Sequence, residues 1–130
     1  MPLVTLTVLD STPAGERRAL LDAIHDALVA VGVPPADRFQ RVLALPADSL
    51  VYDPTYPEPP DRSASRRNDQ FALVEVLWSA GRSVKVKKQL LEHLVDGLRR
   101  LGRDPEHLML VFKETTWENW SFAGGRLLHA

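Results

Sequence analysis

The chain of 130 residues contains no cysteine, which excludes disulfides, thiol nucleophiles and thiolate metal sites. No apolar run approaches the roughly 20 residues that a membrane-spanning helix needs. The N-terminal residues, MPLVTLTVLD, lack the basic and apolar regions of a signal peptide. The net charge of −1 gives no electrostatic reason to expect nucleic acid or an anionic membrane as a partner. These absences predict a soluble, cytoplasmic protein.

The familiar signatures of cofactor and metal chemistry are also missing. The chain has no P-loop, no dinucleotide fingerprint, no Gly-x-Ser-x-Gly turn and no H-E-x-x-H pair. We therefore predict neither a cofactor nor a metal. Hydrophobic residues make up 45% and charged residues 25% of the sequence, which is typical of a globular protein, and 130 residues suffice for one domain spanning 1–130.

The two halves of the chain resemble each other at an offset of 70 residues. Gly32 and Gly102 are each followed three residues later by a proline, Pro35 and Pro105. Glycine commonly ends a helix, so these pairs mark equivalent positions in two copies of one unit. The repeat predicts two tandem units, at 2–46 and 70–114.

Each unit has the pattern of a strand, a helix and a second strand. Period-two alternation predicts strands at 3–9, 39–45, 71–78 and 108–114. The first helix is expected to follow Thr12 as N-cap and Pro13 as first helical residue, and the second to span about 84–101. The residues expected to face the core are Leu20, Leu21, Ile24, Leu28 and Val31 in the first helix, and Leu91, Leu94, Val95, Leu98 and Leu101 in the second.

A helical crossover normally joins two parallel strands. We therefore predict an α/β fold of the α+β type, in which two tandem β-α-β units form one four-stranded sheet with both helices on one face. A connecting loop, 47–69, separates the units, and its first part suits a short hairpin. The C-terminal segment, 115–130, is aromatic and glycine-rich and is expected to form a turn or short hairpin.

Three features are candidates for a functional site. Pro2 begins a strand, where its missing N–H costs nothing, and removal of Met1 would leave its ring nitrogen as a free secondary amine. Arg82 lies in SAGRS, a strand-to-helix turn at which a planar guanidinium can clamp a carboxylate. Trp120 and Phe122 share one side of an extended segment and can form a pocket wall. Chance, an ordinary turn arginine and core packing are the plainer explanations.

Other polar residues favour structural explanations. The basic segment KVKK (Lys85, Lys87 and Lys88) is expected to be a solvated helix face, and the histidines have no partners at ligand spacing.

The candidate segments taken together resemble the tautomerase superfamily, in particular its long-chain members with fused β-α-β repeats, similar to malonate semialdehyde decarboxylase. The resemblance covers nearly the whole chain. The segments that carry it are MPL at 1–3, LLDAIHDAL at 20–28, PPADRFQRV at 34–42, LVYDPTY at 50–56, GRS at 81–83 and ENWSFAGG at 118–125.

The resemblance implies a cofactor-free homotrimer that acts on a small carboxylate substrate. It assigns Pro2 as the catalytic amine, Arg82 as the carboxylate clamp and Asp37 as the residue that activates water or orients the amine. Trp120 and Phe122 would form the hydrophobic wall. Arg38 and Gln40, from the same segment as Asp37, are expected to help bind the substrate.

The sequence departs from this family in two respects: the number of arginines near the GRS turn, and a connecting loop, with PEPPDRSASRRND, that is longer than expected. The decarboxylase and the cis-acting dehalogenases use two neighbouring arginines, whereas here Ser79 and Ala80 stand where a second could be. Arg62, Arg66 or Arg67 of the connecting loop could supply a second arginine instead.

Three functions are therefore open. An apolar wall and Arg82 would disfavour the Pro2 cation and leave a neutral base for keto–enol tautomerisation. Asp37 beside the amine would instead favour the cation, and with it a hydratase or decarboxylase of three-carbon oxo or unsaturated acids. The third is a non-catalytic ligand-binding module on a ferredoxin-like scaffold, which predicts an antiparallel sheet and an exposed Pro2.

Overall fold

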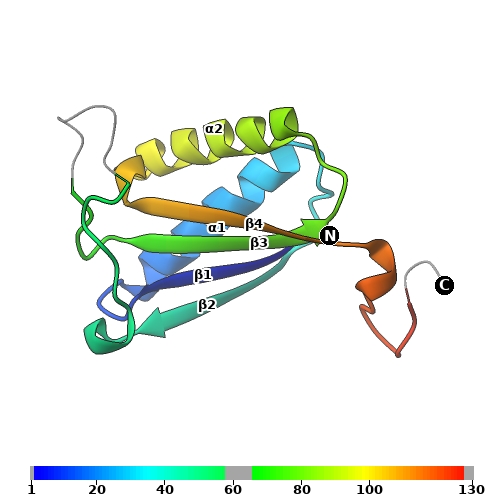
Figure 1. Ribbon diagram of the computed structural model, residues 1–130, viewed down its shortest axis with the longest axis horizontal. Coiled ribbons are helices and arrows are strands. Elements are labelled where there is room, and N and C mark those ends of the chain that lie inside the picture. The colour runs from blue at the N-terminus through cyan, green and yellow to red at the C-terminus, as the bar shows by residue number, and fades with distance from the viewer. Residues whose placement is uncertain (1, 58–65, 128–130) are drawn as a thin grey trace.

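The computed structural model describes residues 2–57 and 66–127 of the chain. Within these residues lie four strands and two α-helices, with short 3-10 helices at Ala47–Ser49, Pro105–His107 and Trp117–Asn119 (Figure 1). The longer elements are β1 (Leu3–Leu9), α1 (Ala14–Ala30), β2 (Phe39–Leu45), β3 (Ala72–Ser79), α2 (Val84–Arg100) and β4 (Leu108–Thr115). Strands β1 and β2 have the predicted bounds, and β3 and β4 lie within one residue of theirs.

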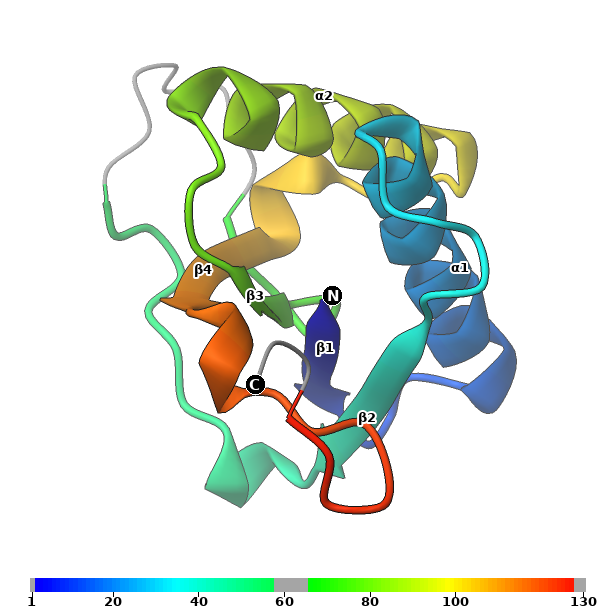
Figure 2. The same ribbon diagram turned by 90° about the vertical axis from the view of Figure 1, so that its right-hand side faces the viewer.

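The sheet has the strand order β2-β1-β3-β4. Strand β1 is parallel to β2 and β3 is parallel to β4, while β1 and β3 meet antiparallel in the middle. Figures 1 and 2 show α1 and α2 on the same face of this sheet. The predicted pair of β-α-β units is thus confirmed. The fully antiparallel sheet of the ferredoxin-like alternative is wrong.

The core lies between this sheet face and the two helices. Alternation turns every second residue of β1 and β3 toward the helices, which present leucines and isoleucine spaced three or four residues apart. The buried residues are Val4, Leu6 and Val8 of β1, Ala72, Val74, Val76 and Trp78 of β3, Leu20, Ile24 and Leu28 of α1, and Leu90, Leu94 and Leu98 of α2.

Both helix predictions contain local errors. Helix α1 begins at Ala14, because Pro13 has an extended backbone (φ −60°, ψ 150°) and occupies the N-cap position itself, without a side-chain hydrogen bond. Thr12 is therefore not the cap. Helix α2 turns Leu90 rather than Leu91 fully into the core, in line with Leu94 and Leu98. Leu91 and Val95 lie beside that line and are only partly buried, and Leu101 is exposed at the C-cap.

The connecting loop differs from the predicted hairpin, whereas the tail contains a turn, one of the two predicted forms. In the loop, the chain forms a 3-10 helix at Ala47–Ser49 after Pro46 rather than a strand. In the tail, a 3-10 helix at Trp117–Asn119 is followed by a bend through Gly124 and Gly125, both with positive φ, within the described residues. The part of the chain that the structure describes contains no helix long and apolar enough to cross a membrane.

The strand register gathers four chain segments at one end of the sheet. Leu3, at the start of β1, pairs with Phe39 at the start of β2 and with Leu77 near the end of β3. Ser79, the last residue of β3, pairs with Thr115, the last residue of β4. Whatever precedes β1 and β2 or follows β3 and β4 therefore lies at this end.

Candidate active site

The sequence-predicted site residues come from these four segments. Pro2 precedes β1, Asp37 precedes β2, Arg82 follows β3, and the tail with Trp120 and Phe122 follows β4. Figure 2 looks onto this end of the sheet, where the start of β1, the ends of β3 and β4 and the C-terminal tail gather. The fold thus brings residues that are far apart in the sequence to one end of the molecule.

Pro2 is buried at this end. The strand register, continued by one residue, places it between Arg38 and Trp78. Pro2 has the same parity as Val4, so it lies on the helix-covered side of the sheet, as Trp78 does. The exposed Pro2 expected for the ferredoxin-like alternative is therefore wrong. Since Met1 precedes Pro2 in the sequence, its ring nitrogen is a free amine only after Met1 has been removed.

Arg82 is fixed by the turn that leads from β3 into α2. Gly81 has a φ of +105°, a conformation that glycine adopts readily, and Ser83 caps α2 by accepting a hydrogen bond from the Val86 N–H. The Nη1 of Arg82 donates to the Ser79 carbonyl at 2.8 Å and to the Ser79 hydroxyl at 2.7 Å. Its Cζ lies 4.3 Å from the centre of the Trp78 ring. The guanidinium is therefore oriented before any ligand arrives.

Two carboxylates share the electrostatic environment of Arg82. Partial burial lowers the pKa of Arg82 from its ordinary value, while the charges of Glu114 and Asp37 oppose that shift. An arginine remains charged over the physiological range despite such a shift. Arg82 is thus a permanent cation, with Asp37 and Glu114 close enough to act on it.

Glu114 also forms an ion pair with the first turn of α2. Lys87 Nζ lies 2.5 Å from Glu114 Oε1, with side chains 27% and 33% exposed. The same ammonium group lies 5.7 Å from the centre of the Phe112 ring, and Phe112 stacks on Trp78. The prediction of a wholly solvated lysine face is therefore wrong for Lys87, although Lys85 and Lys88 are exposed.

Arg38 and Gln40 are bound to α1. Arg38 Nη2 contacts Asp22 Oδ1 at 2.5 Å, and its Nε donates to Gln40 Oε1 at 2.9 Å. Gln40 Nε2 in turn donates to the Leu21 carbonyl at 2.8 Å. The hydrogen bond from Arg38 is the largest cause of a lowered pKa at Asp22. This network attaches the start of β2, and with it Asp37, to the helix.

The aromatic residues of the tail form a wall that reaches β2. The rings of Trp120 and Phe122 stack with centroids 5.9 Å apart, and Phe122 lies 5.4 Å from Phe39. The Nε1 of Trp120 is buried and has no hydrogen-bond partner within the described residues. Phe122 and Phe39 both remain exposed.

The described parts of the connecting loop, 47–57 and 66–69, lie at the opposite end of the sheet, because they follow β2 and precede β3 (Figure 1). Arg67 is held there by the carbonyls of Asp53 and Tyr56, at 3.0 and 2.6 Å. It therefore does not approach Arg82 within its own chain. Arg66 lies in the same loop, and Arg62 falls outside the described residues.

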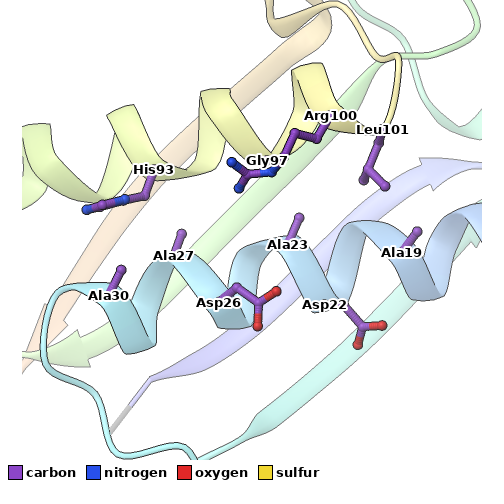
Figure 3. A pocket seen from close by; sticks show the side chains of 10 residues that line it. All are labelled: Ala19, Asp22, Ala23, Asp26, Ala27, Ala30, His93, Gly97, Arg100 and Leu101. Carbon is purple, nitrogen blue, oxygen red and sulfur yellow. The ribbon is translucent and has the colours of Figure 1, made fainter.

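A groove of about 360 Å³ lies between α1 and α2 (Figure 3). Small side chains on α1, including Ala19, Ala23 and Ala30, create it together with Gly97 of α2. Asp22 on its wall is already engaged by Arg38. None of the sequence-predicted site residues lines this groove.

Sequence reasoning did not assign Trp78, Glu114 or Lys87 to the site. A signal for Trp78 exists, because alternation along β3 turns it inward four residues before Arg82. Glu114 becomes its neighbour only through the register of β3 against β4, in which Trp78 pairs with Glu114. The sequence pattern of β4 alone does not contain that register.

A family model described as "Tautomerase enzyme" matches residues 37–123, which is more than half of the chain. The chain belongs to this tautomerase family. The matched region includes Asp37, Arg82, Trp120 and Phe122, and begins after Pro2.

Solved structures that are similar to the chain include two malonate semialdehyde decarboxylases. The FG41 enzyme, inhibited by 3-bromopropiolate, is 25% identical with a TM-score of 0.83, over 96% of this chain and 92% of that one. The other was solved to give a structural basis for its decarboxylase and hydratase activities. It is 27% identical with a TM-score of 0.83, over 96% of this chain and 93% of that one. A fused 4-OT solved as a symmetric trimer is 24% identical with a TM-score of 0.73, over 96% and 94%, and shares the fold. The resemblance noted in the sequence is confirmed.

Proposed function

We propose that this protein is a cofactor-independent tautomerase, which interconverts the keto and enol forms of small 2-keto or 2-hydroxy-unsaturated carboxylates. The observation that carries the proposal is the oriented guanidinium of Arg82, held by Ser79 at the same end of the sheet as the buried Pro2. A fixed cation beside a candidate base suits a substrate that carries a carboxylate next to the reacting carbons.

In the proposed reaction, Arg82 binds the substrate carboxylate and the neutral amine of Pro2 removes the enol hydroxyl proton. The electron pair of that O–H bond forms the carbonyl, and the C=C pair takes the same proton back from the Pro2 cation at carbon. Negative charge develops on the enolate, where a fixed guanidinium is most effective. The wall of Trp120 and Phe122 packs against Phe39 on the uncovered face of the sheet and would border the site from that side. Arg38 and Gln40 would hold the Asp37 segment in place.

The placement of Asp37 favours a second candidate. Asp37 precedes β2 at the same end of the sheet as Arg82, and its charge raises the pKa of that arginine. A Pro2 cation with Asp37 as water-activating base would support hydration or decarboxylation of three-carbon oxo or unsaturated acids. The similar structures solved as malonate semialdehyde decarboxylases are consistent with that chemistry. The two candidates differ in the active protonation state of Pro2.

The open face of the sheet supports a homotrimer. Phe39 and Leu43 of β2 and Met109 and Val111 of β4 are exposed on the face that neither helix covers. Apolar side chains gathered on an uncovered sheet face commonly mark an interface between chains. A similar fused 4-OT forms a symmetric trimer.

The direct test compares Pro2→Ala and Arg82→Ala with the parent protein in the ketonisation of an enolpyruvate. Both changes should lower kcat/KM by about 100-fold or more, the usual minimum contribution of a positioned acid or base. Arg99→Ala, an exposed arginine in the last turn of α2, is the matched control and should leave the rate unchanged. Equal rates for all the proteins would refute the tautomerase assignment.

A further inference from the structure

The Arg82 guanidinium has limited room for a ligand. Its Nη1 carries two hydrogens, and the Ser79 carbonyl and hydroxyl both lie within 2.8 Å of that nitrogen. Trp78 covers one face of the planar group. A carboxylate that binds with both oxygens must therefore use the edge formed by Nε and Nη2.

A protein carboxylate lies close to this cation. Trp78 and Glu114 are paired residues of β3 and β4 and have their side chains on the same face of the sheet. Glu114 is also the carboxylate with the larger effect on the pKa of Arg82, ahead of Asp37. An internal carboxylate that reached Arg82 would compete directly with the carboxylate of a substrate.

The Glu114 carboxylate is paired with Lys87 of α2. The two side chains form an ion pair of 2.5 Å, and the same ammonium group lies 5.7 Å from the centre of the Phe112 ring, which stacks on Trp78. No ion pair between Arg82 and Glu114 within 4.0 Å occurs in the described residues, so Glu114 is bound by the lysine and not by the arginine.

We propose that Lys87 is a positioning residue that keeps the Glu114 carboxylate away from Arg82, and so keeps the Arg82 edge open to a substrate carboxylate. The inference rests on the proposed role of Arg82 as the anion site. In this role Lys87 does not contact the substrate. Its contribution depends on Glu114 and disappears when Glu114 carries no charge.

Four variants test this arrangement: Lys87→Met, Glu114→Gln, the double variant and Lys88→Met. Methionine replaces the lysine by a long uncharged side chain, and Lys88→Met makes the same charge change at an exposed position of the same helix. Binding of pyruvate is measured by calorimetric titration, and KM and kcat are measured for the ketonisation of an enolpyruvate. Thermal unfolding confirms that each variant is folded.

Lys87→Met should raise the Kd of pyruvate and the KM by about fivefold, as expected for the loss of a partly exposed ion pair that sets a local charge. It should leave kcat unchanged. Glu114→Gln should bind pyruvate at least as well as the parent protein. The double variant should bind like Glu114→Gln, because no carboxylate is left to block Arg82.

Two results would overturn the proposal. An unchanged Kd in Lys87→Met would show that Glu114 does not need to be held. A double variant as weak as Lys87→Met would show that Lys87 attracts the ligand itself. Pyruvate binding needs no turnover, so the expected binding pattern in a protein without ketonisation activity would refute the tautomerase proposal alone. Ketonisation without that binding pattern would refute the role of Lys87 alone.

Discussion

The cation of Arg82 lies over the ring of Trp78, with its Cζ 4.3 Å from the ring centre. Trp78 is completely buried and stacks on Phe112. The Arg82 guanidinium therefore packs against a side chain that is itself held in place. A cation held in this way loses little conformational entropy when it binds an anion. The Trp78 and Ser79 contacts together orient the Arg82 guanidinium before a ligand binds.

Ser79→Ala should weaken carboxylate binding without changing the chemical step. The variant removes the hydroxyl that accepts from Arg82 Nη1 and leaves the carbonyl acceptor in place. We expect KM for an enolpyruvate to rise about fivefold, which corresponds to about 1 kcal/mol for one hydrogen bond, with kcat almost unchanged. Ser121→Ala, an exposed serine of the tail, is the control. An unchanged KM would show that Trp78 and the Ser79 carbonyl suffice to orient Arg82.

The Asp22 carboxylate should contribute to stability in a pH-dependent way. The hydrogen bond from Arg38 holds its pKa below the ordinary value, so its contribution is complete above the pKa of the unfolded chain. That contribution is lost as pH falls through the lower, folded pKa. The Asp22 side chain is 48% exposed, so solvent screening limits the effect to below about 1 kcal/mol.

Asp22→Asn should therefore lower the free energy of unfolding at pH 7, and the difference from the parent should shrink in acid below the folded pKa. Urea denaturation at several pH values measures it. Asp26→Asn, one turn further along α1, is the control. A difference that persists unchanged in acid would mean that packing, not charge, accounts for the effect of the substitution.

The open sheet face should mediate assembly. Leu43→Asp places a charge on this face, where Leu43 is 44% exposed, and we expect it to convert a trimer into monomers. Leu101→Asp is a matched control, because Leu101 is 43% exposed but lies at the end of α2. Light scattering reports the mass of each variant in solution. A parent protein that is monomeric, or a Leu43→Asp variant that remains trimeric, would contradict this assembly.

Much of the fold could be predicted because its signals are local. Alternation fixed the bounds of β1 and β2, and the repeated glycines at 32 and 102 indicated two equivalent units. The α2 residues that face the sheet were less predictable. Two adjacent apolar stripes, one with Leu90 and Leu94 and one with Leu91 and Val95, lie side by side on this helix. Only packing against the sheet selects the stripe with Leu90 and Leu94.

The candidate site was predictable to a similar degree. The starts of β1 and β2 and the ends of β3 and β4 meet at one end once the topology is known, so Pro2, Asp37 and Arg82 follow from the two-unit pattern. The ion pair of Lys87 with Glu114 does not, because its partners lie 27 positions apart in the sequence and meet through tertiary packing. Sequence patterns show which face a lysine occupies, but not which carboxylate reaches it.

Pro2 is proposed to act as a neutral base at the end of the sheet that also holds Arg82. The most direct test is the pH dependence of kcat/KM for the ketonisation of an enolpyruvate, using protein whose intact mass shows that Met1 has been removed. We expect kcat/KM to rise with pH as the Pro2 amine loses its proton, and then to reach a plateau. A value that instead climbs as pH falls, or a mass that retains Met1 in fully active protein, would contradict this role of Pro2.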